Sequence, residues 1–67
     1  MYKLIKNSFD KVNVVERLSD NAFIPFDQAN TDYQTFKKEV LAGAELQDAD
    51  GNVMTQEQAD AYIASLP

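Results

Sequence analysis

The segment Ile24–Phe36, with the sequence IPFDQANTDYQTF, marks a change from extended to helical structure. Pro25 has no backbone N–H to donate to a ladder, so an extended segment must end there or lie at a sheet edge. Asn30 is a favourable helix N-cap, and Asp32 suits the positive start of a helix. The segment therefore predicts strands before it and a helix after it.

Three short extended segments are expected before this point. They cover residues 2–6, 12–18 and 22–24, separated by turn-like residues at Asn7–Lys11 and Ser19–Asn21. Within the second segment the alternation places Val12, Val14 and Leu18 on one face, and Asn13, Val15 and Arg17 on the other. One buried face and one face in water is typical of an antiparallel sheet.

Two helices are expected after Pro25. The first covers residues 31–42 and ends at Gly43; the second begins at Thr55, which forms a capping box with Gln58. Their apolar stripes are Tyr33, Phe36, Val40 and Leu41 in the first helix, and Ala59, Tyr62, Ile63 and Leu66 in the second. Between them, Leu46 and Val53 flank a tight turn at Asp50-Gly51 as a miniature hairpin. The order predicts an α+β fold, a small antiparallel β-meander of about three strands followed by two helices packed on it.

The composition narrows the possible functions. Residues 1–67 make a single small domain, and they include no cysteine and no histidine. Disulfides, thiolate zinc sites and the usual neutral-pH acid–base group are therefore absent. The net charge is −5 and the six basic residues form no stripe, so neither nucleic acid nor an anionic membrane is an expected partner. No cofactor is expected.

A weak calcium-binding pattern covers residues 46–57. On the register of a calcium-binding helix–loop–helix, Asp48 and Asp50 fall at ligand positions and Glu57 falls at the final, bidentate position. Asn52 is a further oxygen donor in the same loop. Leu46, however, occupies the first position, where a carboxylate should begin the coordination sphere. The other interpretation is a plain turn at Asp50-Gly51 followed by a capped helix.

Catalysis is not expected from this sequence. The carboxylate pairs Asp27 with Asp32, and Asp48 with Asp50, lie in cap-forming and turn-forming segments, where such side chains accept backbone hydrogen bonds. General acid–base chemistry also needs an enclosed pocket, for which so small a chain has little volume. We therefore expect a protein that is not an enzyme.

A binding face is the stronger functional candidate. Phe9 lies in a turn and Phe26 directly follows Pro25, so both are harder to bury than the other aromatic residues. If both are exposed, they form an apolar patch of the kind that marks an interface. The alternative is that the helix start folds Phe26 onto the sheet.

The segment Ile24–Phe36 also resembles a short pattern in small, uncharacterised bacteriophage proteins, including marine-phage-like proteins and proteins related to tail or tail-fibre assembly. That pattern reads Ile-Pro-x-Asp-x-x-Asn-x-Asp-Tyr-Gln followed by an aromatic residue, and it is matched by Ile24, Pro25, Asp27, Asn30, Asp32, Tyr33, Gln34 and Phe36. The chain departs from the pattern at Gln28, Val40-Leu41 and Gly43-Ala44. The resemblance implies a phage origin and a shared structural piece, and it supplies no catalytic residue.

Together these observations lead us to expect a non-enzymatic small phage protein that acts through protein–protein contacts. It would be a virion or tail structural or assembly component, located in the host cytoplasm, the virion or both, with a protein partner or a second copy of itself. The alternative is a small calcium-responsive domain that uses the loop at residues 46–57.

Overall fold

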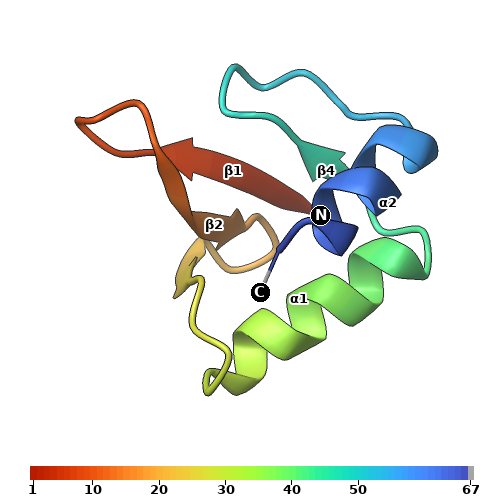
Figure 1. Cartoon of the computed structure of the whole chain (residues 1–67), viewed down its shortest axis with the longest axis horizontal. Coiled ribbons are helices and arrows are strands. Elements are labelled where there is room, and N and C mark those ends of the chain that lie inside the picture. The colour runs from red at the N-terminus through yellow and green to blue at the C-terminus, as the bar shows by residue number, and fades with distance from the viewer. Residues whose placement is uncertain (67) are drawn as a thin grey trace.

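The computed structural model describes residues 1–66 and contains four strands and two helices (Figure 1). In chain order these are β1 (Tyr2–Lys6), β2 (Val12–Arg17), β3 (Ala22–Pro25), α1 (Thr31–Leu41), β4 (Leu46–Gln47) and α2 (Gln56–Ala64). The expected α+β class is confirmed, as are three antiparallel strands followed by two helices.

The sheet has one more strand than expected, and it is mixed. Its order is β3-β2-β1-β4, with β1 antiparallel to β2, β2 antiparallel to β3, and β4 parallel to β1. Leu46 lies next to Tyr2, and the Tyr2 N–H donates to the Glu45 carbonyl at 2.9 Å. The miniature hairpin is also present, since Gln47 bridges Val53. The predicted three-stranded antiparallel meander is present as β1, β2 and β3. The sheet differs from the prediction by its fourth strand, because the segment after α1 pairs in parallel with the free edge of β1.

Both helices pack on one face of the sheet. Tyr2, Leu4, Val15 and Ile24 point toward them and are buried, together with Leu46 of β4. Leu4, Val15 and Ile24 are cross-strand neighbours, so they form one apolar row across β1, β2 and β3. The buried face of β2 is therefore the face of Val15, and Val14 lies on the opposite side.

Helix α1 begins and ends where local chemistry predicts. The Asn30 side chain caps it by accepting hydrogen bonds from the N–H groups of Asp32 and Tyr33, at 2.9 and 3.2 Å. At the other end, Gly43 has φ +110 and its N–H donates to the Val40 carbonyl. The Ala44 N–H reaches the Glu39 carbonyl, which completes a Schellman motif.

The buried stripe of α1 consists of Tyr33, Phe36 and Val40, as expected, but Leu41 is 55% exposed. The prediction that Leu41 belongs to this stripe is therefore wrong. It is the last residue of the helix, and the chain turns away at Ala42 before another element can cover it.

Helix α2 is held against α1 and the sheet by its apolar side. Ala59 and Ile63 are buried, and Tyr62 and Leu66 pack against the core. The expected capping box is present, with Thr55 and Gln58 exchanging hydrogen bonds of 3.1 Å. The Gln56 side chain also donates to the Val40 carbonyl near the end of α1, at 3.1 Å. The Gln56 contact therefore joins the start of α2 to the end of α1.

Candidate protein-binding surface

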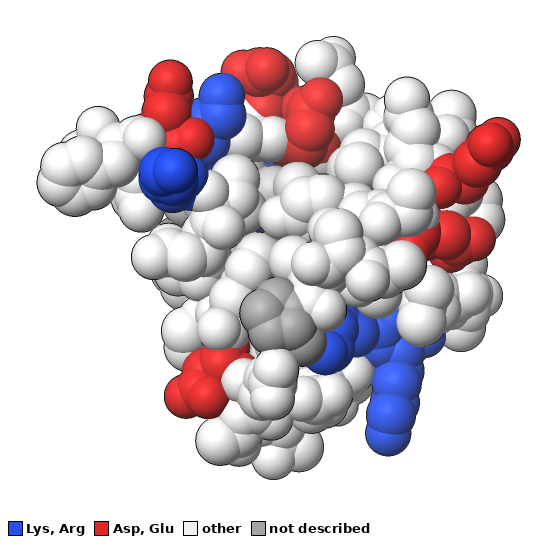
Figure 2. Space-filling model, viewed as in Figure 1, with Lys and Arg blue, Asp and Glu red and all other residues white. Residues whose placement is uncertain are grey.

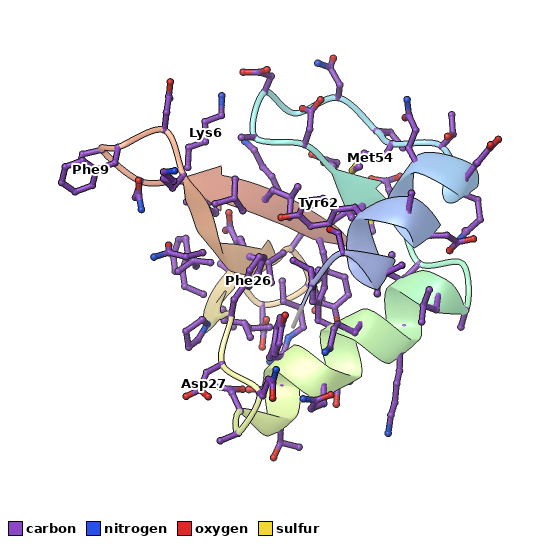
Figure 3. All side chains as sticks on the ribbon, in the orientation of Figure 1. Lys6, Phe9, Phe26, Asp27, Met54 and Tyr62 are labelled. Atoms are coloured by element: carbon purple, nitrogen blue, oxygen red, sulfur yellow. The ribbon has the colours of Figure 1, made fainter. Side chains whose placement is uncertain are left out.

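The β1–β2 hairpin projects from the body of the molecule, and Phe9 lies at its tip. The turn is fixed by Asn7, whose side-chain oxygen accepts hydrogen bonds from the N–H groups of Phe9 and Lys11 at 2.8 and 3.1 Å. Asp10 adopts a left-handed conformation with φ 61, which closes the turn. Phe9 is 79% exposed and points away from every other element (Figure 3). In the space-filling view the tip is uncharged, with acidic and basic side chains just behind it (Figure 2).

Phe26 occupies a different part of the molecule. Its ring stacks on Tyr33 and on Phe36, with centroids 5.2 and 6.1 Å apart, and it packs against the core. Figure 3 shows Phe26 over the centre of the molecule and Phe9 far out on the hairpin. The structure therefore does not bring the two predicted interface residues together: Phe9 is exposed, whereas Phe26 is half-buried by the folding of the helix start onto the sheet.

The second exposed apolar surface is the sheet face that the helices leave uncovered. It carries Ile5, Val14, Phe23 and Pro25, and we call these four residues the open apolar face. Ile5, Val14 and Pro25 are cross-strand neighbours in one row, and Phe23 lies in the next row with 64% of its surface exposed. Neither Ile5 nor Val14 packs against the core. Sequence reasoning missed this surface because the alternation in residues 12–18 does not reveal which face is buried.

The outer edge of β3 has few groups that could extend the sheet. The Phe26 N–H donates to the Asn13 carbonyl at 2.9 Å, so by the alternation of an antiparallel ladder Phe23 and Pro25 direct their backbone groups away from β2. Pro25 has no N–H, which leaves Phe23 as the outward donor. The prediction that Pro25 ends its strand or lies at a sheet edge is confirmed on both counts. A proline at this place limits edge-to-edge pairing.

The loop at residues 46–57 uses its acidic residues for its own turn. The Asp48 carboxylate accepts hydrogen bonds from the N–H groups of Asn52 and Asp50, each at 2.9 Å. These bonds, the one from Asn52 first, hold the pKa of Asp48 below its usual value. Gly51 takes φ +88 in the turn, and Leu46 is only 1% exposed in the core.

The predicted calcium residues do not form a coordination sphere. Asp48, Asp50 and Asn52 lie in the turn, and Glu57 lies in the first turn of α2. Among residues 1–66, no group of three or more acidic side chains gathers where it could hold a metal ion. In this structure the Asp48 carboxylate stabilises the turn of the loop, and Glu57 lies at the start of α2.

The Arg17 guanidinium makes ion-pair contacts that join β2 to the following turn and to α1. Arg17 on β2 pairs with both oxygens of Asp20 at 3.0 and 2.9 Å and lies 3.6 Å from Asp32 on α1. The hydrogen bond to Asp20 raises the pKa of Arg17, and the same contact lowers the pKa of Asp20. The other carboxylate in a predicted pair, Asp27, accepts the Ala29 N–H at 3.0 Å. Asp27 and Asp32 thus have backbone and ion-pair partners, and within residues 1–66 the surface has no pocket around them.

Neither helix of the described chain has the length and apolar character required to cross a membrane. Comparison of the chain with family models, with curated proteins and with solved structures finds no match.

Proposed function

We propose that this chain is a non-enzymatic binding protein and that Phe9 is the residue it inserts into a partner. The observation that carries the proposal is the fixed exposure of Phe9 at the tip of the β1–β2 hairpin. A large apolar ring held in water by a hydrogen-bonded turn has a cost that binding would remove, because a partner pocket would take the ring out of water.

The turn also favours tight association. Two hydrogen bonds to the Asn7 side chain and the closing conformation of Asp10 hold the tip in one shape before any partner is met. A preorganised loop loses less conformational entropy on binding than a flexible one. Aromatic anchors of this kind contribute a large share of the energy at protein interfaces. Lys6, Asp10 and Lys11 lie around Phe9, so a matching pocket would carry charges of both signs at its rim.

We further propose a phage origin, with the chain serving as a structural or assembly component of the virion or tail, in the host cytoplasm, the virion or both. The support is the resemblance of Ile24–Phe36 to the pattern in small phage proteins. In this fold the residues of that segment cap α1 and build the core, so the resemblance concerns a structural piece. The net charge of −5 and the scattered basic residues favour a protein over a nucleic acid as the partner.

Site-specific photo-crosslinking tests the proposal. A photoreactive phenylalanine analogue replaces Phe9 in the full chain, which is expressed in host cells during infection, and crosslinked products are identified by mass spectrometry. A discrete product that contains a virion or assembly protein is expected. The matched control places the same analogue at Val53, which is also exposed, at 59%, but lies in the loop before α2. The analogue at position 53 should not form the crosslink to the virion or assembly protein.

A second arm separates binding from folding. Phe9→Ser should abolish the crosslink of the natural partner, measured with the analogue at a neighbouring position such as Ser8, and leave the circular dichroism spectrum unchanged. If positions 9 and 53 give the same products, or if purified virions and infected cells both lack a partner, the proposal is wrong.

A further inference from the structure

The open apolar face departs from what an uncovered sheet face should be. Six positions of β1, β2 and β3 point away from the helices, and they are Lys3, Ile5, Val14, Glu16, Phe23 and Pro25. A sheet with one face in water alternates apolar residues inward with polar residues outward. Four of these six outward side chains are apolar, so the face has the character of a surface that is covered in the functional assembly.

The charges on this face are balanced, unlike those of the whole chain. Lys3 and Glu16 are cross-strand neighbours, and they are the only charged side chains among the six, so the formal charge of the face is zero. Most of the acidity lies elsewhere, because no basic residue follows Lys38 in the sequence, whereas six acidic residues do: Glu39, Glu45, Asp48, Asp50, Glu57 and Asp60. Two copies can therefore approach through this face without bringing their acidic surfaces together.

The arrangement of the face is also self-complementary. In one row the order across the sheet is Phe23, Glu16, Lys3 and Gln47, and in the next it is Pro25, Val14 and Ile5. Consider two copies whose sheets face each other about a two-fold axis that runs parallel to the strands, between β1 and β2. Each row of one copy then lies over the same row of the other copy, with the strand order reversed. Lys3 of one copy then lies opposite Glu16 of the other, and Ile5 lies opposite Val14. Every such contact occurs twice in the dimer, once in each direction, as an isologous interface requires.

Lys3 and Glu16 are available for this role. Within residues 1–66 neither makes an ion pair, although each is half-buried beside apolar neighbours. From these observations we propose that the open apolar face binds a second copy of this chain, with the two sheets packed face to face about that axis. Aligned sheets pack about 10 Å apart with strands roughly 30° from parallel, which keeps the paired positions close enough to interact. The hairpin tip at Phe9 is a different surface, and the inference does not depend on the proposed function.

Sedimentation equilibrium of the full chain tests the proposal. The wild type should reach twice its monomer mass of 7.5 kDa as its concentration rises. Lys3→Glu places two acidic side chains opposite each other across the interface, and Glu16→Lys places two basic ones there, so each variant alone should dimerise at least roughly tenfold more weakly. Lys38→Glu, the same charge reversal at an exposed position on α1, is the matched control and should dimerise like the wild type.

Mixing the two charge variants gives the decisive result. In the mixture each substituted position faces the opposite charge on the other copy, so a heterodimer should form although neither variant associates alone. Within each variant, residues 3 and 16 carry the same charge whether or not the other variant is present. A dimer that forms only in the mixture therefore reports contacts between copies and not a repaired fold.

An isotope-filtered NMR experiment on a mixed labelled and unlabelled wild-type sample provides a test that needs no variant. It should show contacts between the methyl groups of Ile5 in one copy and Val14 in the other. A wild type that remains monomeric at every concentration, a dimer that both charge variants leave intact, or a dimer with no filtered contact at these methyls each overturns the proposal. If the protein is monomeric, the open apolar face does not bind a second copy. The crosslinking experiment at position 9 tests the proposed function independently of this result.

Discussion

The Tyr2 hydroxyl donates a hydrogen bond to the Glu39 carboxylate, and this contact joins the first strand to the last half of α1. The Tyr2 ring is buried and meets Phe36 edge-on, with centroids 5.0 Å apart. One residue thus supplies both an apolar contact and a polar contact between the sheet and the helix layer.

Tyr2→Phe should lower the free energy of unfolding at pH 7 by about 1 kcal/mol, because it removes the hydrogen bond and keeps the ring. Burial, followed by the hydrogen bond to Glu39, raises the pKa of Tyr2 to about 12 from its ordinary value of 10.0. The protonated Tyr2 hydroxyl therefore contributes to the free energy of unfolding below pH 10, and this contribution is lost as the pH rises toward 12. Urea unfolding at pH 7 and pH 11 should show the gap between variant and wild type narrowing at the higher pH. A constant gap would contradict this account.

The two predicted interface phenylalanines should respond differently to truncation. Phe26→Ala removes a ring stacked on Tyr33 and Phe36, and we expect it to cost about 2–4 kcal/mol of stability. Phe9→Ala removes a ring that contacts no other element, and its effect should stay within about 0.5 kcal/mol. Thermal unfolding of both variants at the same concentration makes the comparison. Equal losses would mean that Phe9 packs against the body of the protein.

Calcium at millimolar concentration should leave the thermal midpoint unchanged, because Leu46 lies in the core and the Asp48 carboxylate is engaged by its own loop. Calorimetry should record no heat of binding. A midpoint that rises with calcium, and that ceases to rise in Glu57→Gln, would restore the calcium interpretation.

Asp48→Ala should lower the thermal midpoint by removing the oxygen that closes the turn. Since the pKa of Asp48 is lowered in the folded state, its contribution is present above the ordinary pKa of 3.8 and is lost as the pH falls through the folded value. The variant should therefore differ most from wild type at pH 7 and least near pH 2. Asp50→Ala is a suitable control, because the carboxylate of Asp50 does not close the turn.

Gly43→Ala should cost about 1–2 kcal/mol, because φ +110 is a conformation that L-amino acids avoid. Space is not the cause, since an added Cβ would lie 3.8 Å from the Gln56 side-chain oxygen, an ordinary contact. Chemical synthesis allows a control in which D-alanine occupies position 43, and this chain should be at least as stable as wild type. A loss of stability with both enantiomers would point to a clash instead.

The parts of the fold that could be predicted from the sequence are those decided by neighbours along the chain. Asn30, Gly43 and Thr55 cap or end helices through hydrogen bonds to backbone groups a few residues away, so their roles follow from local sequence. The apolar spacing of Tyr33, Phe36 and Val40 likewise gave most of the buried stripe of α1.

The parts that could not be predicted depend on contacts between distant residues. Nothing near Leu46 indicates that it will lie beside Tyr2 in a parallel pair. The valines of β2 alternate on both faces, and only packing against Leu4 and Ile24 decides that Val15 is buried. The open apolar face, which follows from that choice, therefore could not be predicted from the sequence. The burial of Phe26 was one of two alternatives that the sequence left open, and its stacking on Tyr33 and Phe36 decides between them.

The parallel pairing of β4 with β1 has a consequence for synthesis in the cell. Tyr2 leaves the ribosome long before Leu46, so the antiparallel hairpins of β1, β2 and β3 can form first, while the other side of β1 waits for its partner. Contacts between residues so far apart in sequence form slowly, because a long loop must close before they bring any gain. A nascent chain halted before Glu45 would expose the Tyr2 backbone and the apolar side of β1. The four-stranded sheet can therefore form only after the segment that contains β4 has been synthesised.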